Sequence, residues 1–198
     1  MPFADEPRLQ MNFAAKVALC AMFTGFGWIK GARAADLAQP PARSLSAVKA
    51  QILVELAAYI RWPPRETRES KFVIAIVGRS PFGDELAEYA AQHTIQGRPI
   101  AIHYWKWAQD TGSCDMIFIC ESDQRWAKDI QDWCGGRPVL TICESARLTS
   151  DGIMIGLVLE AGRVKLLINR KALGDQGFSA SSQLLHLAQL VGPESGAR

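Results

Sequence analysis

The chain has 198 residues, of which 48% are hydrophobic, and its 22 basic and 20 acidic side chains give a formal net charge of +2. This length allows one domain or at most two small ones, and the near balance of charge gives no basic patch large enough to argue for nucleic-acid binding. A domain of this size buries roughly 70% of its unfolded surface, which is enough for a core without a structural metal.

The first 34 residues have the composition of a secretory signal peptide. Lys16 precedes an apolar run at residues 17–28, and a segment of small residues follows at 31–35. A basic region, an apolar region of about a dozen residues and an A-x-A site are typical of a cleaved export signal. The sequence therefore predicts an exported bacterial protein that is cleaved after Ala34.

Two other interpretations of this segment are weaker. A transmembrane anchor needs about 20 apolar residues, which is more than this run contains, and the glycines within and after the run disfavour a buried helix. Leu19 precedes Cys20, where a lipoprotein signal has a small residue. Met1 and Met11 are both possible first residues. Cleavage would leave 18 basic and 18 acidic residues, a formally neutral chain.

The folded part is expected to begin after a polar leader at residues 35–45. Ser46 is the expected N-cap of a first helix, in which apolar residues recur at helical spacing as far as Ile60. A pair of prolines at 63–64 ends this predicted helix just after Trp62.

The next part of the sequence alternates short apolar runs with helical patterns. Runs that are apolar on both faces belong in a covered, largely parallel sheet, and their alternation with helices is typical of right-handed βαβ units. The predicted fold class is a three-layer, Rossmann-like α/β domain with a mostly parallel sheet. The predicted strands are residues 71–77, 100–105, 116–119 and 139–142, and the predicted helices are residues 81–92 and 122–133.

A C-terminal β-hairpin extends this pattern. Residues 152–160 and 163–169 are rich in aliphatic side chains and flank a two-residue turn at 161–162. Gly156 inside the first of these strands indicates a bulge or a close backbone approach.

A last helix is expected after Ser181 and Ser182, with apolar positions that extend to Val191. The predicted domain therefore spans residues 46–192, and residues 193–198 are expected to form a disordered tail.

Several short motifs occur in a fixed order along this domain, and in that order the chain resembles the YfiR family of periplasmic proteins over about residues 46–192. The motifs are Lys49-Ala50, Trp62-Pro63, the strand ending in Gly78, Pro81-Phe82-Gly83, Gln96-Gly97-Arg98-Pro99-Ile100, residues 114–119, residues 136–141, the Gly152 hairpin ending in Asn169, and Ser181-Ser182-x-Leu184-Leu185.

The resemblance implies a periplasmic α/β domain that often dimerises and that regulates another protein. In the namesake system, the family protein restrains a membrane-bound diguanylate cyclase through that enzyme's periplasmic part, which lowers cyclic di-GMP. The partners expected here are a membrane-bound signalling protein and a second copy of the chain, with no cofactor, metal or nucleic acid. The namesake's cysteines in its first strand and final hairpin have no equivalents in residues 72–77 and 152–169.

Four cysteines remain after cleavage: Cys114, Cys120, Cys134 and Cys143. In an oxidising compartment an even number favours disulfides. Cys114 and Cys134 are expected at one end of a βαβ unit, and Cys120 and Cys143 at the other. Because the Cα atoms of bridged cysteines lie within about 7 Å, the predicted disulfides are Cys114–Cys134 and Cys120–Cys143. The alternative is that some are buried thiols. The cysteine spacing does not favour zinc.

The loop from Gly78 to Gly83 joins a strand to a helix and is a candidate ligand site. A helix N-terminus at this point would bind an anion, with Gly78, Ser80 and Gly83 as the candidate residues. The loop lacks the Lys-Ser/Thr of a P-loop and the spacing of a dinucleotide fingerprint. The alternative explains every residue by helix capping, with Ser80 as N-cap and Pro81 at the first helical position.

Aromatic residues supply the candidate contacts for a partner or a dimer. Trp62 follows Arg61 and precedes the proline pair, so a half-exposed indole is expected to bind a partner there. Trp105 and Trp107, at the end of a strand, are a second candidate. The alternative for all of them is packing in the protein's own core.

The sequence contains no catalytic motif such as G-x-S-x-G or H-E-x-x-H. The function expected from the sequence is that of a periplasmic, non-enzymatic regulator that binds and restrains a membrane-bound signalling enzyme. The alternatives are a periplasmic small-ligand sensor, which would bind in the crevice near residues 78–83, and an uncharacterised hydrolase.

Overall fold

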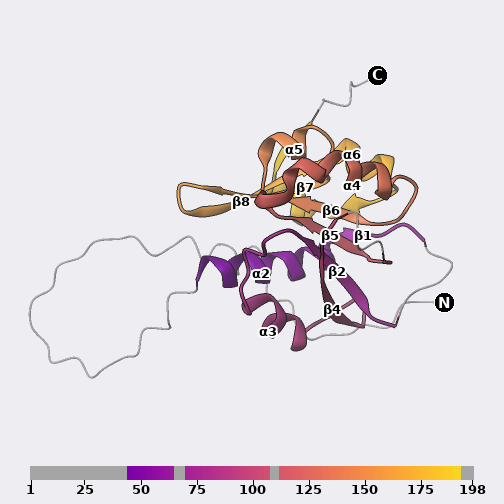
Figure 1. Cartoon of the computed structure of the whole chain (residues 1–198). Coiled ribbons are helices and arrows are strands. Elements are labelled where there is room, and N and C mark those ends of the chain that lie inside the picture. Colours follow the sequence, from indigo (N-terminus) through magenta and orange to yellow (C-terminus); the bar gives the residue numbers. More distant parts are fainter. Residues whose placement is uncertain (1–43, 65–69, 108–111, 193–198) are drawn as a thin grey trace, which may run out of the picture. The chain divides into compact units, whose positions relative to one another are not determined.

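The computed structural model describes residues 44–64, 70–107 and 112–192 (Figure 1). The predicted signal peptide with its cleavage after Ala34, almost all of the leader and the tail at 193–198 lie outside these residues. Within them, no helix combines the length and the hydropathy needed to cross a membrane.

A mostly parallel sheet dominates the described part of the chain, with the strand order β10-β8-β7-β6-β5-β2-β4-β3. All neighbouring strands are parallel except β7 with β8 and β3 with β4. The strands are β2 (Phe72–Val77), β3 (Thr94–Ile95), β4 (Arg98–Trp105), β5 (Met116–Ile119), β6 (Leu140–Cys143), β7 (Ile155–Glu160), β8 (Arg163–Asn169) and β10 (Gln189–Val191).

The order β4-β2-β5-β6-β7 is that of a doubly wound sheet, in which the chain reverses its direction of winding between β2 and β5. Every residue of β2, β5 and β6 is buried. This confirms the prediction that strands apolar on both faces belong to a covered parallel sheet, and β7 with β8 confirms the C-terminal hairpin.

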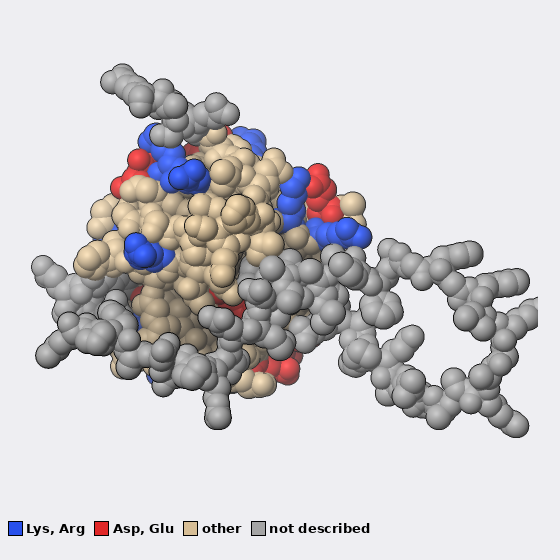
Figure 2. Space-filling view, turned by 180° about the vertical axis from the view of Figure 1, so that it is seen from behind, with Lys and Arg blue, Asp and Glu red and all other residues tan. Residues whose placement is uncertain are grey.

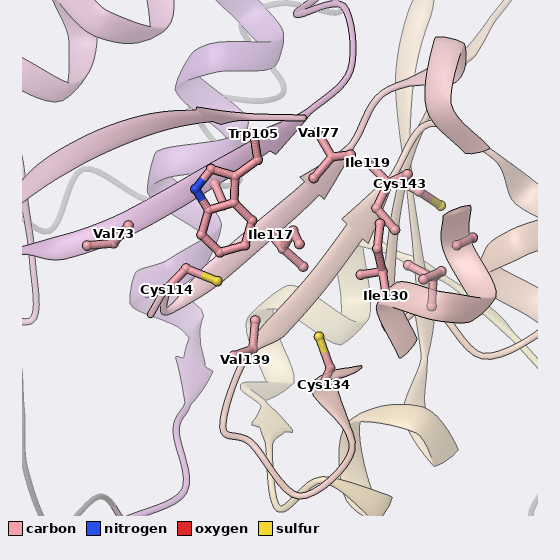
Figure 3. Close-up of a cluster of buried hydrophobic side chains, with 13 residues drawn as sticks. Val73, Val77, Trp105, Cys114, Ile117, Ile119, Ile130, Cys134, Val139 and Cys143 are labelled. Carbon is pink, nitrogen blue, oxygen red and sulfur yellow. The ribbon is translucent and has the colours of Figure 1, made fainter. Parts of the chain in front are cut away.

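Helices cover both faces of the sheet, which makes the three predicted layers. On one face, Ile117 and Ile119 of β5 share a buried cluster with Ile130 and Cys134 of α4 (Figure 3). Phe118 points to the other face, where its ring meets Phe82 at 4.8 Å, just before α3. The helices are α2 (Leu45–Leu56), α3 (Glu85–Ala91), α4 (Ala127–Cys134), α5 (Ala146–Ser150), α6 (Arg170–Asp175) and α7 (Ser182–Leu187), with 3₁₀ turns η1 (Ala57–Tyr59) and η2 (Glu121–Trp126).

The first helix differs from its prediction at both ends. Ser44, not Ser46, is its N-cap, and the Ser44 Oγ accepts a hydrogen bond from the Ala47 N–H at 3.1 Å. The helix ends at Leu56, and residues 60–61 form strand β1, which pairs with β9 (Ser179–Ala180). Pairing with a distant segment overrides the helical spacing here, so Trp62 follows a strand instead of a helix.

The loop before α3 also differs from its prediction. Ser80 is not an N-cap, because α3 begins only at Glu85. The Ser80 Oγ instead accepts a hydrogen bond from the Phe82 N–H at 3.3 Å, which forms a local turn.

The last predicted helix is shorter than expected. The Ser181 Oγ caps α7 by accepting from the Leu184 N–H, as the sequence indicates. The helix ends at Leu187, and residues 189–191 add strand β10 to the sheet edge beside β8.

Gly156 is explained by a close approach and not by a bulge. The ladder between β7 and β8 runs without interruption from Ile155 to Glu160. A Cβ atom at Gly156 would lie 2.5 Å from the Thr149 Oγ1 of α5, so only glycine fits under this helix.

Candidate interaction surfaces

Trp62 lies half-buried between two other aromatic rings. Its ring meets Phe72 of β2 edge-to-face at 5.3 Å and Phe178 at 5.2 Å, and its indole N–H donates to the Ala57 carbonyl at 3.4 Å. Arg61 beside it is exposed. Trp62 therefore joins the end of the first helical segment to β2 and to the residues before β9, while Arg61 presents its side chain to solvent.

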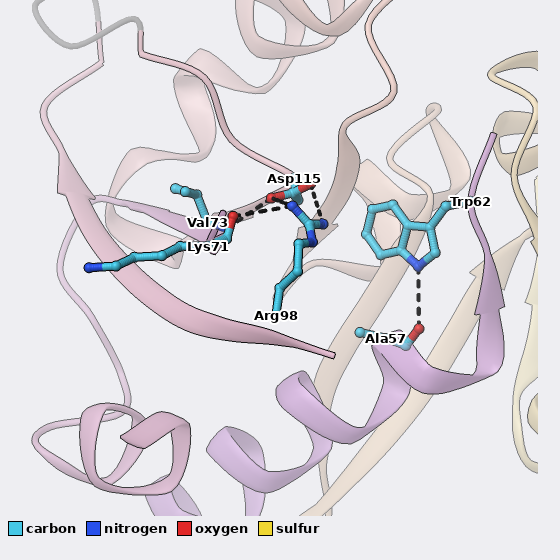
Figure 4. Close-up of polar contacts among 6 residues, drawn as sticks. All are labelled: Ala57, Trp62, Lys71, Val73, Arg98 and Asp115. Carbon is cyan, nitrogen blue, oxygen red and sulfur yellow. Dashed lines mark hydrogen bonds and ion pairs between the residues drawn. The ribbon is translucent and has the colours of Figure 1, made fainter. Parts of the chain in front are cut away.

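A bidentate ion pair lies next to this aromatic group (Figure 4). The Arg98 guanidinium donates to both carboxylate oxygens of Asp115, at 2.8 and 3.3 Å, and to the Lys71 carbonyl at 3.1 Å. The Asp115 carboxylate also accepts from the Val73 N–H at 2.9 Å, and the guanidinium lies over the Phe72 ring. The pair thus ties together the amino-terminal ends of β2, β4 and β5.

The second aromatic candidate is mostly internal. Trp105 is buried in the core cluster, and Trp107 packs against the same cluster half-exposed. Both rings meet Trp133 of α4 edge-to-face, at 6.0 and 5.9 Å. Tyr104, which directly precedes Trp105 and lies on the other face of β4, is the exposed aromatic side chain of this strand.

The predicted ligand loop lies at the carboxyl end of β2, beside the reversal point of the doubly wound sheet. The Arg79 N–H of this loop donates a hydrogen bond to the Ser122 Oγ at 2.8 Å, so it is not free to bind an anion. A Cβ at Gly78 would meet Asp123 and Ser122 at 2.6 and 2.7 Å, so the start of η2 packs directly against the loop. Gly83, by contrast, has open space around it.

A buried ion pair closes the same edge of the sheet. Lys49 of α2 donates to the Glu144 carboxylate at 2.5 Å, and the other oxygen of that carboxylate accepts from the Glu121 N–H at 3.3 Å. Both side chains are about nine-tenths buried. The pair joins α2 to the segments that follow β5 and β6.

A pocket of about 390 Å³ lies at the opposite, amino-terminal edge of the sheet. It opens between α4, the turn before β7 and α6, and its lining includes Gln131, Cys134, Thr141, Asn169 and Asp175. The sequence predicted a ligand crevice at the carboxyl edge instead, where Ser122 and Asp123 pack against Gly78 and Gly83 has open space around it. Among the residues described, no group of three or more His, Cys, Asp or Glu side chains is placed to bind a metal.

All four predicted disulfide cysteines are buried, and no disulfide joins them within the described residues. Burial raises the pKa of the Cys120 and Cys134 thiols to about 12 and also raises the pKa of Cys143. Because the thiolate is the reactive form, these side chains are poor nucleophiles at neutral pH.

The two predicted pairings differ in geometry. Cys114 and Cys134 belong to one buried cluster, and Figure 3 shows both of them near Val139. Cys143 is the register partner of Ile119, so the extended residue that follows, Cys120, points to the opposite face of the sheet. This alternation disfavours the predicted Cys120–Cys143 bridge, which overlooked the pleat of the strand.

Sequence reasoning did not find the two ion pairs. The contact of Arg98 with Asp115 could have been predicted, because the two residues carry opposite charges and stand at the start of β4 and β5, the two strands that flank β2. Nothing in the spacing of Lys49 and Glu144, 95 residues apart, indicates their contact.

The fold and these surfaces define a doubly wound α/β domain. A family model described as YfiR/HmsC-like matches residues 46–189. The chain belongs to this YfiR/HmsC-like family, which confirms the resemblance seen in the sequence.

One solved structure with a related arrangement is the ABC domain in complex with L-Trp from Streptococcus pneumonia. It is 11% identical and has a TM-score of 0.49, and the match covers 74% of this chain and 60% of that chain.

Proposed function

We propose that this chain is a periplasmic, non-enzymatic regulator that binds and restrains a membrane-bound signalling enzyme, a diguanylate cyclase. The observation that carries the proposal is the match to the YfiR/HmsC-like family over almost the whole described domain. The signal-peptide pattern of residues 1–34 supports export, and the raised thiol pKa values argue against cysteine chemistry.

Regulation would act by coupled binding equilibria. The domain would bind one state of the enzyme's periplasmic part more tightly than the other, and release would let the active state form. Arg61 and the exposed side of Trp62 are the proposed contact, because an exposed cation beside a half-buried indole is typical of an interface anchor.

The test measures cyclic di-GMP in cells that lack the gene. We expect its level to rise on deletion and to fall again when the full chain is supplied. A matched control supplies residues 35–198 without the leader, which should remain in the cytosol and fail to lower the level. Equal rescue by both forms, or no change on deletion, would contradict the proposal.

A small-ligand sensor is the second candidate, and the pocket lined by Gln131, Asn169 and Asp175 favours it. Ligand binding there would stabilise the domain against heat. A thermal-shift screen of small polar metabolites tests this candidate, with Gln131→Ala as the variant expected to lose any shift.

We also propose that export leaves Cys114 and Cys134 joined in a disulfide, since both belong to one buried cluster and lie where β5 begins and α4 ends, at the amino-terminal edge of the sheet. Peptide mapping of protein purified without reductant should recover a cross-linked pair containing these residues, with Cys120 and Cys143 as thiols. Four alkylatable thiols after unfolding would contradict this pairing.

A further inference from the structure

The pocket at the amino-terminal edge of the sheet has a buried floor and an open rim. Its floor contains Cys134, Thr141, Met154 and Asn169, which are each only 2–3% exposed. Its volume of about 390 Å³ lies within the range of small-molecule sites, which is about 300–1,000 Å³. The pocket is therefore large enough for a ligand of a few heavy atoms.

The polar atoms of the floor are already used within the fold. The Thr141 Oγ1 accepts a hydrogen bond from the Met154 N–H at 3.2 Å. The Asn169 amide donates to the Thr149 carbonyl at 2.8 Å, and its oxygen caps α6. The Met154 thioether and the Cys134 thiol remain, and both are soft groups that pack well against hydrocarbon. The floor therefore suits the carbon chain of a ligand.

The rim carries hydrogen-bonding groups that the fold does not use. Within the described residues, the side-chain amides of Gln131 and Gln176 have no hydrogen bond. A Cβ at Gly152 would lie 2.9 Å from the Gln131 Nε2, so this amide lies against the turn that carries Asp151. The Asp151 carboxylate is 58% exposed, and its ion pair with Arg147 spans 3.9 Å, which is too long for a hydrogen bond.

The charges of the rim favour a cation over an anion. Among the lining residues, Asp151 and Asp175 carry negative charge and Lys171 carries positive charge. The Lys171 ammonium donates to the Asp175 carboxylate at 2.6 Å, which leaves Asp151 as the charge that a ligand would meet. Figure 2 shows Lys and Arg side chains beside Asp and Glu side chains at the margins of the face it presents, so no large patch of one sign dominates that face.

We infer that this pocket binds a small aliphatic amine. An ammonium group has three N–H donors and no acceptor, and the Asp151 carboxylate with the carbonyl oxygens of Gln131 and Gln176 supplies three acceptors at one rim. The carbon chain would lie on the sulfur-rich floor. No aromatic side chain occurs among the described lining residues, so nothing there would stack on a ring. The inference rests on the small-ligand candidate above and names the class of its ligand.

Three probes with the same five-carbon chain test the charge preference by titration calorimetry of the full chain. Pentylamine should bind at one site, and 1-pentanol and pentanoate should bind at least about tenfold more weakly, because neither offers a cation to Asp151. Asp151→Asn should weaken pentylamine binding at least about tenfold. Asp129→Asn is the matched control, since Asp129 is an exposed residue of α4 that does not line the pocket.

The methionine methyl groups locate the bound probe by NMR. Pentylamine should shift the Met154 methyl signal until the site is saturated and leave the Met116 signal in place. Met116 is fully buried on the other face of the sheet, since its neighbour Ile117 shares the cluster of α4.

The outcomes separate this inference from the proposals above. Equal binding of pentanoate or 1-pentanol, or undiminished binding by Asp151→Asn, would overturn the amine as ligand and leave the small-ligand candidate standing. An unmoved Met154 signal with all three probes would overturn the inference and count against that candidate. Neither result would bear on the regulation of a cyclase, which the cyclic di-GMP measurement tests.

Discussion

The Arg98 guanidinium and the Asp115 carboxylate form a bidentate pair that fastens three parallel strands at one edge of the sheet. Asp115 is only 2% exposed, and its carboxylate also accepts the Val73 N–H. The pair therefore substitutes for backbone hydrogen bonds where the strands begin, and its loss would leave buried polar groups without partners.

Asp115→Ala should lower the free energy of unfolding by about 3 kcal/mol, because it leaves a largely buried guanidinium uncompensated. Urea denaturation measures the change. Lys171→Ala is the control, since it removes an exposed pair with Asp175 and should change stability by less than about 1 kcal/mol. Equal urea midpoints for Asp115→Ala and the wild type would refute this role.

Gly156→Ala should destabilise the domain, because the added Cβ would lie 2.5 Å from the Thr149 Oγ1 in a buried position. Overpacking of this kind costs typically about 1–3 kcal/mol. Gly174→Ala in α6 is the matched control, since nothing lies within 4 Å of the added atom, and it should be neutral or stabilising. The melting temperatures of the two variants should therefore separate, and identical values would show that α5 moves aside.

The reduced protein should lose stability as the pH rises above 9. Burial raises the pKa of the Cys120 and Cys134 thiols from 9.0 to about 12, so the folded state holds protons that the unfolded state releases. The stabilisation is complete below pH 9 and is lost progressively up to about pH 12. Urea midpoints in the presence of a reductant measure the slope. The double variant Cys120→Ala and Cys134→Ala should show a shallower slope, and an unchanged slope would exclude these thiols as its cause.

Arg61→Glu should weaken partner binding without changing the melting temperature, because Arg61 is exposed. Trp62→Ala is a poorer probe than the sequence indicates, since it also removes the ring contacts to Phe72 and Phe178. We expect it to cost about 2–3 kcal/mol of stability. The measurement is co-purification of the enzyme's periplasmic part with each variant. Undiminished binding by Arg61→Glu would show that Arg61 is not part of the contact.

The sheet was predictable from the sequence because each central strand is apolar on both faces. Residues 116–119 match their predicted strand, and β2 starts one residue later than expected. The errors fall where a distant segment decides the local structure. Ile60 fits a helical stripe but pairs with Ala180, and Leu190 fits a helix but pairs beside Ile168.

The interaction surfaces were less predictable for a related reason. A half-exposed Trp62 next to an exposed Arg61 agrees with the expectation from their position beside two prolines. The burial of Trp105 and the opposite orientations of Cys120 and Cys143 depend on which way a pleated strand faces. The contact of Lys49 with Glu144 depends on how α2 lies across the sheet.

The hydroxyl of Ser122 accepts the Arg79 N–H at the point where doubly wound proteins commonly hold a phosphate group. This hydrogen bond holds the loop after β2 against the start of η2, so Arg79 and Ser122 would have to separate before the Arg79 N–H could bind an anion.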